Sequence, residues 1–155
     1  SICKNTTAAK LDRVSKNYIL DFDKERMYSE QMAKEMHTKC ATVMEDVGNL
    51  SGGNMQKVLL GKWLFAEPDI LILDEPTRGI DVGAKYEIYC IINRMVAEGK
   101  SVIMISSEMP EILGMCDRIY VMNEGKFIAE MNGKDATQEK IMTEIINSGK
   151  SDNIK

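Results

Sequence analysis

The sequence predicts an α/β fold, and three observations lead to this prediction. An apolar run over residues 70–73 lies between Pro68 and Pro76, as is typical of a strand buried on both faces of a parallel sheet. A helical pattern follows over residues 83–98, and a second apolar strand pattern follows over residues 102–105. Strand, helix and strand in this order are typical of a parallel α/β unit.

Three helices are predicted ahead of the first strand. Residues 4–14 and 24–36 are polar with apolar positions at helical spacing. Residues 51–66 give a stronger helical pattern, which Ser51 can cap at its start. We expect one face of this third helix to be buried, through Met55, Val58, Leu59 and Trp63.

The helix over residues 83–98 and the segments after it are predicted in the same way. Its buried face is expected to consist of five apolar side chains, Ile88, Ile91, Ile92, Met95 and Val96. A short helix, a hairpin and a last helix should follow, over residues 110–115, 118–130 and 137–147. We therefore expect a helical-subdomain part over 1–50, an α/β core part over 51–148 and a tail over 149–155.

Composition sets further bounds. The chain has 155 residues, a formal net charge of −4 and 44% hydrophobic residues, which suits about one globular domain. No apolar run approaches the roughly 18–20 residues that span a bilayer, and the acidic balance argues against a nucleic-acid partner. The four cysteines lie far apart without metal-ligand spacing, so we expect reduced cytoplasmic thiols.

One candidate site lies at the start of the helix over residues 51–66. Gly52 and Gly53 leave backbone N–H groups uncovered there, the helix N-terminus adds partial positive charge, and Ser51 adds a hydroxyl donor. These groups suit a phosphate. An ordinary loop with a serine N-cap would have the same local sequence, so this motif alone does not decide between them.

A second candidate site follows the first strand. Asp74 and Glu75 come at its carboxyl end, where open α/β sheets bind their ligands. The aspartate can bind Mg²⁺ and the glutamate can orient or deprotonate a water molecule. Two solvated turn carboxylates before Pro76 are the alternative interpretation.

In their fixed order, the two motifs resemble the nucleotide-binding cassette of ABC transporters. Residues 50–56 resemble the ABC signature, residues 70–75 the Walker B strand with its catalytic glutamate, and residues 77–81 the D-loop. Residues 105–108 lie where the family has its switch loop. The resemblance implies the C-terminal part of a P-loop NTPase fold, a parallel-sheet core with helices on both faces plus a helical subdomain.

Two longer strings resemble a narrower group within this family. DEPTRGIDVGAK at residues 74–85 and SSEMPEIL at residues 106–113 are similar to the second cassette of double-cassette ATPases in bacterial monosaccharide importers. The galactose/methyl-galactoside type is the best match, with the ribose type close. The similarity is dense over residues 47–132 and looser over residues 1–46.

The resemblance implies ATP contacts at the signature. Ser51 and Gly53 would contact the γ-phosphate of an ATP held by the opposite cassette, with Gly52 and Asn54 completing the loop. Asn54 stands where most signatures have glutamine, which is normal for sugar importers. Asp81 would communicate across the interface between the cassettes.

The resemblance also implies roles at the chain's own nucleotide site. Asp74 would bind Mg²⁺ and Glu75 would position the attacking water. Ser107 stands where most cassettes carry the switch histidine. A hydroxyl cannot carry the positive charge of an imidazole, so a weakened or non-hydrolytic site is implied here. The only histidine, His37, is expected on the surface of the helical lobe.

A complete P-loop is missing from these residues. Neither Gly99-Lys100-Ser101 nor Gly149-Lys150-Ser151 has the first glycine of GxxxxGK[ST]. We expect the P-loop to lie upstream of residue 1. The full-length protein is therefore expected to be an ATPase, and the chain alone to be inactive.

The partners implied are the membrane permease subunits, the first cassette of the same polypeptide and, indirectly, a periplasmic sugar-binding protein. The implied location is cytoplasmic, peripheral on the inner face of the cell membrane. An ATPase of a ribose- or xylose-type importer, a non-transport ABC ATPase, and a regulatory module without ATP chemistry remain as alternatives.

Overall fold

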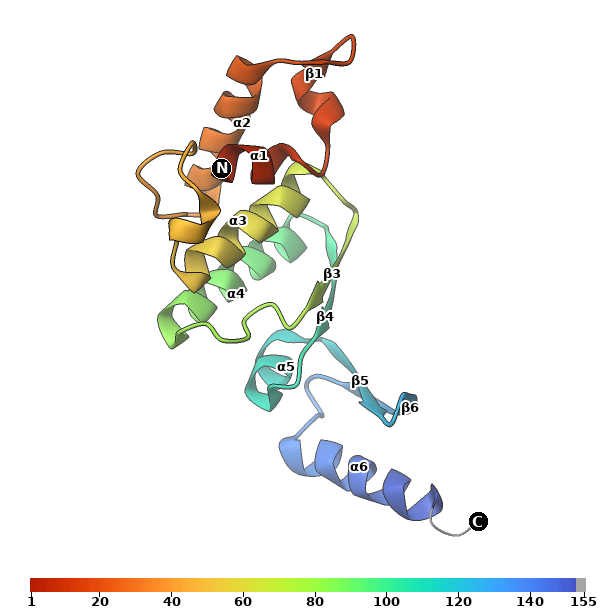
Figure 1. The fold of residues 1–155 in the computed structure, drawn as a ribbon. Helices are drawn as coiled ribbons and strands as arrows, with labels where there is room; N and C mark the ends of the chain where they lie inside the picture. Colours follow the sequence, from red (N-terminus) through yellow and green to blue (C-terminus); the bar gives the residue numbers. More distant parts are fainter. Residues whose placement is uncertain (153–155) are drawn as a thin grey trace. The chain divides into compact units, whose positions relative to one another are not determined.

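A computed structural model describes residues 1–152 of the chain, and Figure 1 shows the fold. Contacts between residues divide the chain into two compact units, which meet in sequence at Ile103 and Met104. The predicted parts 1–50, 51–148 and 149–155 stay a prediction.

The first unit begins with two helices and a small hairpin. α1 spans Ile2–Thr7 and α2 spans Phe22–Glu35, where the Asp21 side chain caps α2 by accepting from the backbone N–H of Lys24. A 3₁₀ turn, Leu11–Val14, lies between them. The predicted single helix over residues 4–14 is therefore wrong, because Lys10 leaves the helical region at φ −152° and ψ 69°.

The hairpin was not predicted. β1 (Ser15–Lys16) pairs antiparallel with β2 (Ile19–Leu20), and the two residues between them, Asn17 and Tyr18, have φ of 51° and 63°. Positive φ at both central residues is the geometry of a type I′ turn, for which asparagine is favoured. Asn17 is thus the feature of the sequence that could have indicated this turn.

α3 spans Gly52–Phe65 and confirms the predicted third helix. Arg13 binds its C-terminal end: the guanidinium donates to the carbonyl oxygen of Phe65 at 2.5 Å and pairs with Glu67 at 3.0 Å. The same group lies 4.6 Å from the centre of the Phe65 ring. A cation at the carbonyl end of a helix is stabilised by the helix dipole, so Arg13 fastens the turn after α1 to α3.

The buried face of α3 differs from the prediction. Val58 is buried, whereas Met55, Leu59 and Trp63 are 39%, 44% and 44% exposed. The residues buried instead include two glycines and a lysine: Gly53, Lys57, Leu60, Gly61 and Phe65. Glycine lets another helix approach closely, since a Cβ at Gly61 would lie 2.9 Å from Cγ of Met32 in α2.

β3 (Ile70–Asp74), α4 (Val82–Ala97) and β4 (Ser101–Ile105) follow. β3 and β4 pair in one sheet, and the helix between them is the connection that parallel strands require. The strand–helix–strand prediction is confirmed. Four of the five residues predicted to be buried on α4 are buried, and Val96 is 45% exposed.

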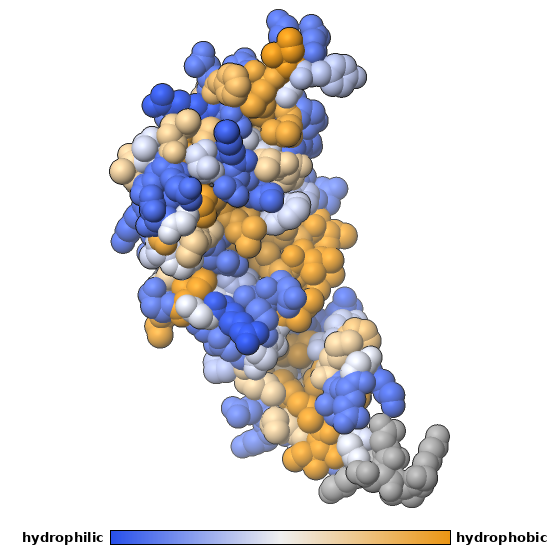
Figure 2. Space-filling model, in the orientation of Figure 1, coloured by the Kyte–Doolittle hydropathy of each residue, from blue (hydrophilic) through white to orange (hydrophobic). Residues whose placement is uncertain are grey.

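Burial of β3 on both faces is contradicted within the described residues. Leu71 and Leu73 are buried, but Ile70 is 60% and Ile72 is 63% exposed, and Ile103 of β4 is 52% exposed. Figure 2 shows apolar side chains gathered where β3 and β4 lie in Figure 1. Buried and exposed side chains alternate along β3, so one face of this strand is covered and the other is open.

The second unit contains α5 (Met109–Met115), the antiparallel hairpin β5 (Arg118–Asn123) and β6 (Lys126–Asn132), and α6 (Gln138–Asp152). These confirm the predicted short helix and hairpin. Ile119, Val121 and Ile141 form its core. The predicted end of the last helix at residue 147 is wrong, because α6 continues to Asp152.

Ser148 links this continuation of α6 to the hairpin. Its hydroxyl donates to the carbonyl of Ile145 and accepts from Asn123 Nδ2 at 3.0 Å, which ties the helix to the hairpin. Residues 153–155 of the predicted tail lie outside the described residues. Among residues 1–152, no helix combines the length and the apolar character needed to cross a membrane.

Candidate functional site

The first predicted site lies at the N-terminus of α3, and its serine is exposed. Ser51 is the N-cap residue, but its Oγ accepts a hydrogen bond from Asn54 Nδ2 at 2.9 Å instead of capping a backbone N–H. Asn54 Oδ1 in turn accepts from the backbone N–H of Lys39 at 2.8 Å. The first N–H groups of α3 therefore receive no cap from the Ser51 side chain, and such groups suit an anion.

The two glycines of this loop have different surroundings. Among the described residues, a Cβ at Gly52 would meet no atom within 4 Å. A Cβ at Gly53 would lie 2.6 Å from Cβ of Ala84 in α4, closer than side-chain carbons approach. Gly52 therefore leaves open space for a ligand, whereas Gly53 permits α3 to pack against the start of α4.

The second predicted site lies at the carboxyl end of β3. Asp74 is exposed and ends the strand, and Glu75 is half-buried with a φ of 47°. The carbonyl of Glu75 accepts from the backbone N–H of Arg78 at 3.2 Å, so the chain turns immediately after the two carboxylates. Gly79, at φ 73°, provides the left-handed conformation that this turn requires.

This turn leads directly to Asp81. Asp81 is the N-cap of α4, and its Oδ1 accepts from the backbone N–H of Ala84 at 3.0 Å. Ala84 is the residue that Gly53 contacts, and Ile80 Cγ2 lies 3.6 Å from the same Cβ position. The structure thus brings together the loop at the start of α3 and the segment around Asp81, two of the sites predicted from the sequence.

A buried lysine forms a second link between α3 and α4. The Lys57 side chain is 3% exposed, and its Nζ donates to a carboxylate oxygen of Glu87 and, at 3.1 Å, to the carbonyl of His37. The hydrogen bond from Lys57, and then its charge, hold the pKa of Glu87 below the usual value. These contacts were not predicted from the sequence, because the partners of Lys57 are a main-chain carbonyl and a surface glutamate.

Ser107 belongs to the second unit, in the loop between β4 and α5. It is exposed, and the neighbouring Ser106 hydroxyl accepts from the backbone N–H of Glu108 at 3.0 Å. The structure determines no position of Ser107 relative to Asp74 and Glu75, which lie in the first unit. Its predicted role therefore stays a prediction.

The carboxylates at the end of β3 fit a magnesium ion that is held partly by the protein and partly by phosphate and water. Within residues 1–152, no group of three or more His, Cys, Asp or Glu side chains could hold a metal ion. Mg²⁺ commonly takes one or two carboxylates and completes its shell with phosphate oxygens and water. Asp74, with Glu75 beside it, fits that arrangement. The two side chains are too few to surround a metal ion with protein ligands alone.

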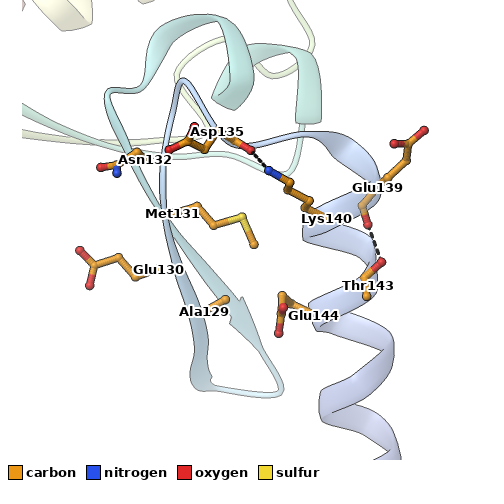
Figure 3. A pocket seen from close by; sticks show the side chains of 9 residues that line it. All are labelled: Ala129, Glu130, Met131, Asn132, Asp135, Glu139, Lys140, Thr143 and Glu144. Atoms are coloured by element: carbon orange, nitrogen blue, oxygen red, sulfur yellow. Dashed lines mark hydrogen bonds between the residues drawn. The ribbon is translucent and has the colours of Figure 1, made fainter.

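A cavity of about 660 Å³ lies elsewhere, between β6 and α6 in the second unit (Figure 3). Its lining is mostly polar and acidic, and Lys140 Nζ donates to the carbonyl of Asp135 at 2.5 Å across one end. None of the predicted site residues lines it. The cavity and the predicted sites are therefore separate features.

Comparisons with known proteins agree with the motifs. The model of the ABC transporter family matches residues 4–78. The L-arabinose transport ATP-binding protein AraG of Geobacillus stearothermophilus is 57% identical over 141 residues, 91% of this chain and 28% of that protein. The xylose import ATP-binding protein XylG of Geobacillus kaustophilus is 54% identical over 92% of this chain and 28% of its own.

A third relative and a solved structure extend the comparison. A putative ribose/galactose/methyl galactoside import ATP-binding protein of Halalkalibacterium halodurans is 47% identical over 92% of this chain and 27% of its own. A solved ATP-binding cassette of an ABC transporter has a TM-score of 0.78 and 20% identity, covering 95% of this chain and 61% of that chain. The chain thus spans little more than a quarter of the curated relatives, and the solved cassette confirms the predicted fold class.

The contact at Gly53 gives a stability prediction. Gly53→Ala should destabilise the chain by about 1–3 kcal/mol, because its Cβ would force α3 away from α4. Gly52→Ala is the matched control and should change stability by no more than about 0.5 kcal/mol. Urea unfolding of the two variants measures both, and equal values would show that the close approach is no constraint.

The Lys57–Glu87 pair gives a pH prediction. Because the folded pKa of Glu87 is lowered, the pair stabilises the fold above about pH 4.3, the usual glutamate pKa, and this is lost as the pH falls further. Glu87→Gln, which keeps an acceptor for Lys57, should cost about 1 kcal/mol at pH 7, since Glu87 is half-exposed, and progressively less as the pH falls below the usual glutamate pKa. Urea unfolding from pH 3 to 7 checks this, with exposed Glu98→Gln as control; a difference independent of pH would contradict it.

Proposed function

Since the chain is part of an ATP-binding domain of the ABC transporter family, of the kind found in sugar importer ATPases, we propose that its full-length protein hydrolyses ATP to drive sugar import. The observation that carries this proposal is the contact of Gly53 with Ala84. It joins the loop of Ser51 to the cap of α4, directly downstream of Asp74 and Glu75. Residues that the resemblance assigns to ATP are thus linked through neighbouring segments of the first unit.

The loop at the start of α3 would bind phosphate. Ser51 offers an exposed hydroxyl, and Gly52 leaves the first backbone N–H groups of the helix approachable. Gly53 would act by bringing the loop against α4 as well as through its own N–H. The resemblance assigns this loop to an ATP held by an opposite cassette, and we retain that assignment as part of the proposal.

Asp74 and Glu75 would serve the chain's own nucleotide. Asp74 would be a carboxylate ligand of Mg²⁺, which when bound supplies charge compensation for the phosphates. Glu75, one residue further and half-buried, would orient the attacking water and accept its proton. Ser107 offers a hydroxyl in place of an imidazole, so we propose that this site hydrolyses ATP weakly or not at all.

The partners and location follow from the same proposal. The whole protein would work with membrane permease subunits, pair this segment with a first cassette of the same polypeptide, and respond indirectly to a periplasmic sugar-binding protein. It would be cytoplasmic and peripheral on the inner face of the cell membrane. Asp81, at the cap of α4, would take part in the contact between the cassettes.

The transported sugar is a separate part of the proposal. The motifs favour galactose or methyl galactoside, whereas the relative whose name includes galactose is 47% identical and those named for arabinose and xylose are 57% and 54% identical. Identity therefore favours a pentose, and galactose remains the alternative. Uptake of labelled arabinose, xylose, ribose and galactose by cells with and without the gene would decide among them.

The proposed division between the sites gives a kinetic prediction. In the full-length protein, Ser51→Ala should reduce ATP hydrolysis at least about tenfold, because a donor to the competent site is lost. Glu75→Gln should reduce it less, because Glu75 serves the site that contains Ser107. Steady-state phosphate release measures both, with exposed Ser101→Ala and Glu98→Gln as matched controls; equal losses would indicate two active sites.

A second prediction concerns the 155-residue chain alone. It carries no GxxxxGK[ST] motif, so most phosphate contacts of a P-loop are missing. We expect no binding of Mg-ATP at micromolar concentration and no hydrolysis. Isothermal titration calorimetry tests this, and a micromolar dissociation constant would contradict the assigned roles of the signature and strand-end residues.

A further inference from the structure

Three hydrogen-bonding groups form a chain that ends at Ser51. The backbone N–H of Lys39 donates to Asn54 Oδ1 at 2.8 Å, and Asn54 Nδ2 donates to Ser51 Oγ at 2.9 Å. A backbone N–H can only donate, so the amide atom facing Lys39 must be the oxygen. The amide nitrogen therefore faces Ser51, and the direction of both hydrogen bonds is fixed.

This direction determines what the serine hydroxyl can do. Because Ser51 Oγ accepts from Asn54, its own hydrogen remains to be donated elsewhere. Ser51 is exposed, and its oxygen does not cap a backbone N–H of α3. A hydroxyl that already accepts one hydrogen bond is polarised and becomes a better donor to an anion.

The origin of the chain is itself anchored. Lys39 follows the end of α2, and two residues before it the carbonyl of His37 accepts from Lys57 Nζ at 3.1 Å. Asn54 and Lys57 are three residues apart on α3, so they share one helix face. The segment 37–39 is thus held by two side chains of the helix whose first turn follows Ser51.

We propose that Asn54 is a positioning residue that acts through Ser51. The N–H of Lys39 holds the Asn54 amide in one orientation, and the amide in turn donates to Ser51 Oγ. The hydroxyl hydrogen of Ser51 is then left to be donated to a nucleotide phosphate. This rests on the proposed function, in which Ser51 meets the γ-phosphate. It differs from a direct contact of Asn54 with the nucleotide, which is the alternative outcome of the test. An amide suits this role, because the same group accepts from the N–H of Lys39 and donates to Ser51 Oγ.

A carboxylate in place of this amide would keep one of its two hydrogen bonds and lose the other. In the Asn54→Asp variant, the new side chain could still accept from the N–H of Lys39, so the loop would stay anchored. It could not donate to Ser51, whose hydroxyl would turn inward to the carboxylate and be lost to the phosphate. Asn54→Asp therefore separates anchoring of the loop from orientation of the hydroxyl, whereas Asn54→Ala removes both.

The first arm of the experiment is a double-mutant cycle on ATP hydrolysis by the full-length protein. Asn54→Ala should lower the rate about tenfold, but in the Ser51→Ala background it should lower it by less than about twofold, because the group it orients is already gone. Asn54→Asp should lose as much as Ser51→Ala. The exposed Asn93→Ala is the matched control and should retain the full rate.

The second arm measures the hydrogen-bond chain without activity. Hydrogen–deuterium exchange of a peptide spanning residues 36–44 should speed up at one amide in Asn54→Ala and remain unchanged in Asn54→Asp. An unchanged rate in Asn54→Ala would overturn the proposal, whatever the ATPase does. An equal loss of activity from Asn54→Ala in both backgrounds would overturn it in favour of a direct or purely structural role.

The two arms also separate this proposal from the proposed function. An unmodified protein that hydrolyses no ATP would overturn the proposed function, while the exchange of the Lys39 amide would still decide whether the hydrogen-bond chain exists. Full activity of both Ser51→Ala and Asn54→Ala would overturn the positioning role and the phosphate role of Ser51 together.

Discussion

The packing of α3 against α4 is the constraint on which the candidate site depends. Gly53 meets Ala84 with no room for a side chain, and one turn further along both helices Lys57 meets Glu87. The residue numbers rise together on the two helices, so their first turns run side by side in the same direction. The start of α3, with its exposed serine, and the cap of α4 at Asp81 are therefore fixed relative to each other.

Burial of Lys57 extends this constraint to the segment after α2. A buried ammonium group needs hydrogen-bond acceptors, because loss of solvation without compensation costs several kcal/mol. Glu87 provides one acceptor and the carbonyl of His37 another. Since His37 lies two residues before Lys39, the same lysine that pairs with α4 places the N–H that donates to Asn54. The packing of α3 against α4 and the polar contacts of Lys57 thus hold the Ser51 loop in the same position.

The sequence predicted what depends on apolar periodicity and missed what depends on glycine and main-chain groups. The strands β3 and β4 were predicted from continuous apolar runs, and the inward face of α4 from apolar residues at helical spacing. The face of α3 was predicted wrongly, since Gly53, Gly61 and Lys57 are buried for close approach or ion pairing, which hydropathy does not register. The β1–β2 hairpin was not predicted, because strands of two residues are too short to show alternation of apolar and polar residues. The hydrogen bond from the backbone N–H of Lys39 to Asn54 was not predicted either, because any residue other than proline supplies such a donor.

The two predicted sites differ in how their residues are held: the Ser51 loop is supported by neighbouring side chains, whereas Asp74 lies exposed at a strand end. The Ser51 loop has a buried glycine contact, an ion pair behind it and a directed hydrogen bond to its hydroxyl. Asp74 is instead an exposed residue at a strand end, and Ser107 replaces the ionisable group that the resemblance leads one to expect. Rigid support matters most where a precise geometry is needed, because preorganised donors act without reorganising during the reaction. Under the proposed function, this difference would suit the segment to completing a partner's site more than to hydrolysing ATP at its own.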